Sequence, residues 1–335
     1  MPDDLPLDPE GPAPTAASDT PRRSNRQIGL TVFGVMLAMA GIALIYALAT
    51  VDFRRANDHK SQDAKMAAVV AVPPNELAAL AYLPADIELV AGLAAAQALE
   101  TESGKVLLNS LMLNGFTPEQ IDHVVVATGD LNTLPPRLTI VVRSRRPLDL
   151  VKLRAALKAD QSVQRNGRTT YIGKLPFGTV DGAITFADER TLVAALKPED
   201  LDVVPKTAAG GVGRFPQPVR DSIDKLPSDT PAWLVAHKKP NNAALALALG
   251  LTKVPPDVMQ GILKLSSLSA HATERKGRIE VIASAKGLDA KETTAITDAL
   301  KDAQAGRWTT DGVDPFLLTW SESVAGLKQL LPPRP

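Results

Sequence analysis

The sequence predicts an α+β protein: an N-terminal transmembrane helix, then a duplicated β-α-β-β-α body with an antiparallel sheet and helices on one face. Three observations predict this class. An uncharged apolar stretch runs from Gln27 to Val51. From Asn75 onward, short strand-like runs alternate with alanine- and leucine-rich helical stretches, the pattern of layered α+β folds. The same order of elements begins twice, at Leu83 and at Leu226.

The N-terminal region predicts a membrane anchor. Residues 1–26 are rich in proline and poor in large apolar side chains, so we expect a disordered tail. Residues 27–51 carry no charge, and as a helix they would rise about 37 Å, enough to cross a hydrocarbon core of about 30 Å. The alternative is a signal peptide cleaved after Ala49, because Ala47-Leu48-Ala49 has the small-x-small form. The apolar run exceeds a usual signal h-region, which favours an uncleaved signal-anchor in the lipid bilayer.

The orientation of this single pass is less strongly determined by the flanking charges. Arginines 22, 23 and 26 precede the span, and Arg54, Arg55, Lys60 and Lys65 follow it. These counts nearly balance under the positive-inside rule. A short arginine-bearing tail before a long folded domain favours an extracytoplasmic domain. A cytoplasm-facing membrane scaffold is the alternative.

The remaining chain divides into a stalk and two halves. We predict a helical stalk at 52–74, which Pro73-Pro74 ends, a first α+β half at 75–204, a linker at 205–219 and a second half at 220–332. Each half begins with Leu-Pro-x-Asp, continues through a strand, a helical stretch and two strands, and ends in a helix. Asn166-Gly167 predicts a type I′ hairpin within the first half. Coincidence of common local patterns is the alternative to duplication.

Composition and motifs argue against several function classes. The chain has no cysteine, which removes thiolate nucleophiles, disulfides and cysteine metal sites. Its net charge is zero, which makes nucleic acid a poor partner. None of the four histidines belongs to a His-Glu-x-x-His motif, and no Gly-x-Ser-x-Gly elbow occurs. We therefore predict no catalytic, cofactor-binding or metal-binding residues.

One cluster of basic residues is a candidate site. Arg143, Arg145 and Arg146 form the densest basic patch of the predicted body, at the end of a predicted strand. Guanidinium groups at this density favour an anionic polymer or a lipid headgroup as partner. The alternative is a solvated strand end that binds nothing.

Two short motifs carry a family resemblance. Leu83–Asp86 leads into a strand, and Ile184–Asp200 contains Asp-Glu-Arg-Thr-Leu-Val followed by Pro-Glu-Asp. With the predicted anchor, these motifs resemble uncharacterised single-pass membrane-anchored bacterial proteins, planctomycete-like, in which Leu-Pro-Ala-Asp precedes strands of a domain of unknown function. The resemblance implies an extracytoplasmic domain and supplies no catalytic residues.

The sequence thus favours a membrane-anchored extracytoplasmic module that binds an unknown protein or envelope component and is not an enzyme. A hydrolase whose catalytic residues are dispersed through the fold is the alternative from another class. Convergent acids and histidines in a deep pocket would favour that alternative.

Overall fold

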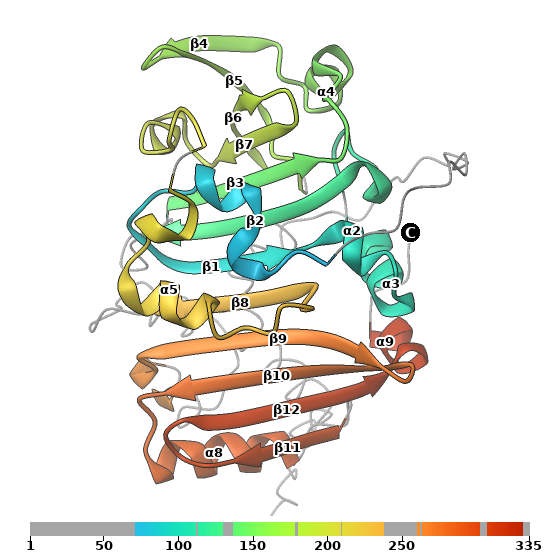
Figure 1. Ribbon diagram of the computed structural model, residues 1–335, viewed down its shortest axis with the longest axis vertical. Coiled ribbons are helices and arrows are strands. Elements are labelled where there is room, and N and C mark those ends of the chain that lie inside the picture. Colours follow the sequence, from blue (N-terminus) through green and yellow to red (C-terminus); the bar gives the residue numbers. More distant parts are fainter. Residues whose placement is uncertain are drawn as a thin grey trace, which may run out of the picture.

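A single antiparallel sheet organises the protein. The computed structural model describes residues 71–330, apart from 112, 130–136, 178–179, 209, 238–259, 262 and 302–306. Within these residues twelve strands pair in the order β11-β12-β10-β9-β8-β1-β2-β3-β7-β6-β5-β4 (Figure 1). The α+β class and the antiparallel sheet are therefore confirmed. The predicted tail, the span at 27–51 and most of the stalk lie outside the described residues, and no helix within those residues is long and apolar enough to cross a membrane.

The elements follow the predicted order closely. The strands of the first half are β1 (Ile87–Leu93), β2 (Ile121–Gly129), β3 (Arg137–Ser144), β4 (Gln161–Arg165), β5 (Arg168–Lys174), β6 (Asp181–Asp188) and β7 (Thr191–Ala195). Those of the second half are β8 (Ala232–His237), β9 (Ser267–Arg275), β10 (Arg278–Lys286), β11 (Arg307–Asp311) and β12 (Phe316–Ser323). The α-helices are α2 (Ala95–Ala98), α3 (Glu102–Ser110), α4 (Leu150–Ala156), α5 (Gln217–Ile223), α8 (Ala290–Lys301) and α9 (Val324–Leu330). Short 3-10 helices are η1 (Pro74–Glu76), η2 (Ala78–Tyr82), η3 (Pro118–Gln120), η4 (Pro198–Leu201) and η5 (Gly211–Arg214).

The two predicted halves meet strand to strand. β1 and β8 pair antiparallel at the centre, with Val90 opposite Val235. From that seam, β2 and β3 continue the sheet on one side, and β9 and β10 continue it on the other (Figure 1). This arrangement has the same order of strands on both sides of the seam. The duplication itself stays a prediction.

The predicted hairpin is confirmed. β4 and β5 pair antiparallel, with Arg165 opposite Arg168. Asn166 and Gly167 have φ values of 48° and 72°, the left-handed values that a type I′ turn requires at both central positions. The turn chemistry therefore fixes the register of this sheet edge.

Helices cover both faces of the sheet, so the prediction of helices on one face is wrong. Val124 and Val126 of β2 pack in a core with α2, α3 and α4. Val125 and Ala127 point the other way, into a core with η2, η4 and α5. Because alternate residues of a strand point to opposite faces, a strand that is apolar at every position needs cover on both sides. We call the two sides the α3 face and the α5 face. α5 lies in front of β8 in Figure 1.

The segment predicted as a linker packs against the first half. Phe215 is 3% exposed and belongs to the core of the α5 face. Arg214 donates from Nη2 to the carbonyl oxygens of Ala81 and Leu83, at 2.9 and 2.8 Å. The chain therefore passes from one half to the other along the surface of η2.

A candidate apolar binding site

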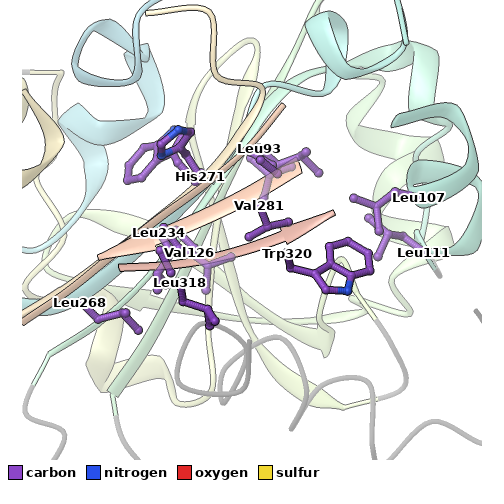
Figure 2. Close-up of a pocket in the computed structure, with 18 of the residues that line it drawn as sticks. Leu93, Leu107, Leu111, Val126, Leu234, Leu268, His271, Val281, Leu318 and Trp320 are labelled. Carbon is purple, nitrogen blue, oxygen red and sulfur yellow. The ribbon is translucent and has the colours of Figure 1, made fainter. Parts of the chain in front are cut away.

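A cavity of about 270 Å³ lies on the α3 face, at the middle of the sheet (Figure 2). Its lining comes from both halves: β1 and β2 with the α3 segment on one side, and β8, β9, β10 and β12 on the other. Cross-strand pairs join these residues on one face, since Ala91 lies opposite both Val126 and Leu234. The cavity therefore spans the seam between the halves.

Small side chains on the strands leave this space open. The lining strands contribute five alanines, Ala91, Ala232, Ala270, Ala272 and Ala283. A methyl group reaches far less into the layer between sheet and helices than the leucines and valines of neighbouring positions. The cavity thus follows from the register that brings alanines of four strands together.

Larger apolar side chains form the walls. Leu107 of α3, the following Leu111, and Phe177 lie on the side of the first half. On the side of the second half, the rings of Trp308 and Trp320 lie 6.1 Å apart at an angle of 49°. Trp320 is 3% exposed and Trp308 is half-buried. Figure 2 shows Trp320, Leu107 and Leu111 on the same side of the cavity.

The cavity presents almost no polar chemistry. Among the described lining residues, His271 is the one with an ionisable side chain. It lies opposite Trp233 in the sheet, and Trp233 packs into the core of the α5 face, so the imidazole points away from the α3 face. Burial lowers the pKa of His271, although Asp229 and Glu280 act to raise it. The imidazole is therefore neutral near pH 7, and the space suits hydrocarbon.

The predicted basic patch is divided by the fold. Arg143 Nη1 donates to Thr191 Oγ1 at 2.6 Å and to Asp188 Oδ2 at 3.1 Å, and only a quarter of its side chain is exposed. Arg145 is half-buried, and its backbone N–H donates to the Gln120 carbonyl at 2.9 Å. Arg146 is exposed. An anionic partner would therefore meet Arg146 first, and Arg143 would have to leave internal partners.

Tyr82 completes the cluster around Asp188, which sequence reasoning did not identify. Its hydroxyl donates to Asp188 Oδ2 at 2.7 Å. Burial, then the hydrogen bond to this carboxylate, raises the pKa of Tyr82 to about 12. Burial acts to raise the pKa of Asp188, but hydrogen bonds from Tyr82, Arg190 and Thr191 outweigh it and lower the pKa. These partners tie η2 to the sheet.

His123 is also used in packing. It is 5% exposed; its Nε2 accepts the Ala79 N–H at 3.0 Å, and its Nδ1 lies 3.0 Å from Asp122 Oδ2. The hydrogen bond with His123 lowers the pKa of Asp122. Both ring nitrogens are engaged, so this pair offers no general base. The described residues contain no group of three or more His, Asp or Glu that could hold a metal ion.

Comparison with known proteins adds little to this site. No family model matches the chain. No curated protein matches it either. Among solved structures, crystal form I of TP0453 is similar, with 10% identity over 74% of this chain and 96% of that chain and a TM-score of 0.41. Crystal form III of TP0453 gives 11% identity over 75% and 96%, with a TM-score of 0.41. A likeness at this level carries no functional argument.

Proposed function

We propose that this chain is a membrane-anchored extracytoplasmic module that binds an envelope component, and that this component is a lipid-like molecule whose hydrocarbon chain enters the cavity. The observation that supports the proposal is the uncharged lining at the centre of the sheet. Ligand sites are mostly apolar and fix orientation with a few polar groups. A lining this apolar favours the hydrocarbon part of an amphiphile, whose polar end would stay at the opening.

The size of the cavity limits the ligand. A volume of about 270 Å³ holds about nine groups of the size of a water or a methylene, at about 30 Å³ each. Each buried methylene contributes about 0.8 kcal/mol. Affinity should therefore rise with chain length up to about nine carbons and then level off, because further carbons find no space. The cavity therefore has space for one hydrocarbon chain of the ligand and not for two.

In this proposal the anchor at 27–51 tethers the domain on the extracytoplasmic side, so that the cavity would lie near a bilayer. A topology reporter fused after Pro335 tests the side directly. Activity of a reporter that works only outside the cytoplasm supports the proposed orientation. Activity of a cytoplasm-only reporter would overturn it and favour the cytoplasm-facing scaffold.

The tryptophans provide a direct test of ligand binding. The chain has three: Trp308 and Trp320 lie on the wall of the cavity, whereas the indole of Trp233 packs into the core of the α5 face. The full chain in a lipid nanodisc is titrated with a fatty acid that carries bromine atoms on its chain, a short-range quencher. We expect saturable quenching of intrinsic fluorescence, and none with the unbrominated acid.

Two matched variants locate the quencher. Ala272→Phe fills the cavity from its floor and should abolish most of the quenching. Ala290→Phe makes the same change at an exposed position of α8 and should leave quenching intact. Equal quenching in both variants, or none in the unmodified chain, would contradict the proposal.

A further inference from the structure

The helix α4 exposes aliphatic side chains that its position does not require. Val151 is 80% exposed, more than any other large hydrophobic residue of the described chain, and Leu150 beside it is 43% exposed. Single surface aliphatics are common. Two adjacent ones, on a helix that packs on the sheet through Leu153, form a small apolar surface.

The start of α4 fixes which residues point outward. Asp149 caps the helix, since its carboxylate accepts the Lys152 N–H at 3.1 Å. Leu153 and Leu157, at 3% and 0% exposed, pack onto the α3 face of the sheet. Val151 lies two residues from Leu153, about 200° around the helix. The cap and the two buried leucines therefore hold Val151 in solvent.

Basic residues surround these aliphatics. From Arg145 to Asp160 the chain has five basic and two acidic residues, whereas the whole chain is neutral. Arg146 is exposed, and 86% of the Lys152 side chain is exposed. The ion pair between Lys152 and Asp149, at 3.3 Å, is itself exposed and so holds the ammonium only weakly. The local charge complements an anionic surface.

We propose that this α4 surface, formed by Arg146, Leu150, Val151 and Lys152, docks the domain on the headgroup layer of an anionic bilayer. Aliphatic side chains between basic ones are the pattern of segments that lie in the membrane interface. The aliphatics enter the boundary of the acyl chains while the basic groups stay among the headgroups. The docking does not depend on a ligand in the cavity.

A surface this small binds weakly alone and suffices when tethered. Each basic residue near an anionic membrane improves binding about fivefold. Stable membrane attachment normally needs two separate signals, of which this surface supplies one. A span at 27–51 would supply the other, because a tether raises the effective concentration of lipid surface to the millimolar range. Since α4 packs on the α3 face, docking would also bring the face that carries the cavity toward the lipid.

Because the chain has no cysteine, a thiol-reactive label attaches only to a cysteine that is introduced. Val151→Cys introduces one thiol into the full chain, which is labelled with an environment-sensitive fluorophore and reconstituted with vesicles. We expect a blue shift, and quenching by spin-labelled lipid, on vesicles of phosphatidylcholine with phosphatidylglycerol, but not on phosphatidylcholine alone. Val313→Cys, at a 42%-exposed valine between β11 and β12, should show neither effect.

Charge reversal tests the basic component. Arg146→Glu combined with Lys152→Glu should lower the ratio of docked to undocked domain at least about twentyfold. Lys225→Glu with Lys286→Glu, both at exposed positions, gives the same change in net charge and should preserve docking. A probe at position 151 that meets no lipid in either vesicle would overturn the proposal and leave the surface to a protein partner. So would equal shifts at positions 151 and 313, or a shift that survives charge reversal at 146 and 152.

Discussion

The two halves of the sheet differ in how they are covered. In the first half, α2, α3 and α4 pack on one face, and η2, η4 and α5 pack on the other. In the second half, α8 packs on the α3 face through Ile296 and Leu300. The α5 face of that half carries half-buried polar residues, among them His271, Glu280 and Ser321. The cavity lies at the boundary, where the helix cover of the first half ends.

The strands explain this difference. In β2, Val124 to Ala127 are apolar at every position, so both faces exclude water. In β9, Ser269, His271 and Thr273 alternate with Ala270 and Ala272, so only one face is apolar. A strand of the second kind needs one layer of cover. The cavity lies on the α3 face at the seam, where a strand that is apolar on both faces and strands that are apolar on one face meet.

The largest expected effect comes from a substitution that disrupts the packing of the first half. Leu192 of β7 is 0% exposed, and Leu192→Ala should lower the free energy of unfolding by about 2–5 kcal/mol. Leu107→Ala makes the same change on the wall of the cavity, where the side chain is half-buried and borders existing space. Leu107→Ala should therefore lower the free energy of unfolding by less than about 2 kcal/mol. Denaturant unfolding of the full chain, followed by circular dichroism, measures both. Equal losses would mean that the cavity is packed in solution.

The next effect concerns the seam between the halves. Gly92 of β1 lies opposite Trp233 of β8, and a Cβ added at Gly92 would lie 2.3 Å from the indole ring. Gly92→Ala should therefore displace Trp233, cost about 1–3 kcal/mol and shift the tryptophan emission. Gly213→Ala is the matched control, because nothing lies within 4 Å of its added Cβ. If Gly92→Ala unfolds like the unmodified chain, then the strands at the seam adjust freely.

Much of the fold could be predicted because its signals are local. Asn166-Gly167 specifies a turn by its own backbone preferences, and Asp149 specifies where α4 begins. The five residues of β11, Arg307–Asp311, escaped prediction because a short edge strand with four polar residues has little hydrophobic pattern. The second helical face could have been predicted from the apolar run of β2.

The cavity could not be predicted from local patterns. Its alanines belong to separate strands, and each looks like an ordinary small core residue in its own segment. Only the register, which places Ala91 opposite Leu234 and Ala272 opposite Val281, brings them to one space. The basic patch shows the converse. Arg143 and Arg146 are close in sequence, but the strand directs Arg143 toward Asp188 while Arg146 stays in solvent.

A smaller effect separates these two arginines. Arg143→Ala removes two hydrogen bonds and leaves Asp188 and Thr191 short of a partner, so it should cost about 1–3 kcal/mol. Arg146→Ala changes an exposed side chain and should stay within about 0.5 kcal/mol. Thermal and denaturant unfolding compare them. A stability loss for Arg146→Ala as large as for Arg143→Ala would mean that the patch acts as one structural unit.

The smallest effect appears only at alkaline pH and concerns Tyr82. The unfolded chain ionises its tyrosines near pH 10, whereas Tyr82 in the folded protein has its pKa raised to about 12. The folded state thus favours the neutral phenol. Its contribution to stability is complete below pH 10, and falls as the pH rises from 10 toward 12.

The change in ultraviolet absorbance as tyrosinate forms measures this ionisation, and the difference between the unmodified chain and Tyr82→Phe isolates one group from the three tyrosines of the chain. Asp188→Asn removes the carboxylate that accepts the hydroxyl hydrogen bond and should move the titration of Tyr82 back toward pH 10, while burial keeps part of the shift. A Tyr82 that ionises with the unfolded value in the folded chain would show that η2 opens without unfolding of the sheet. The dense packing inferred for the first half would then hold for its α3 face alone.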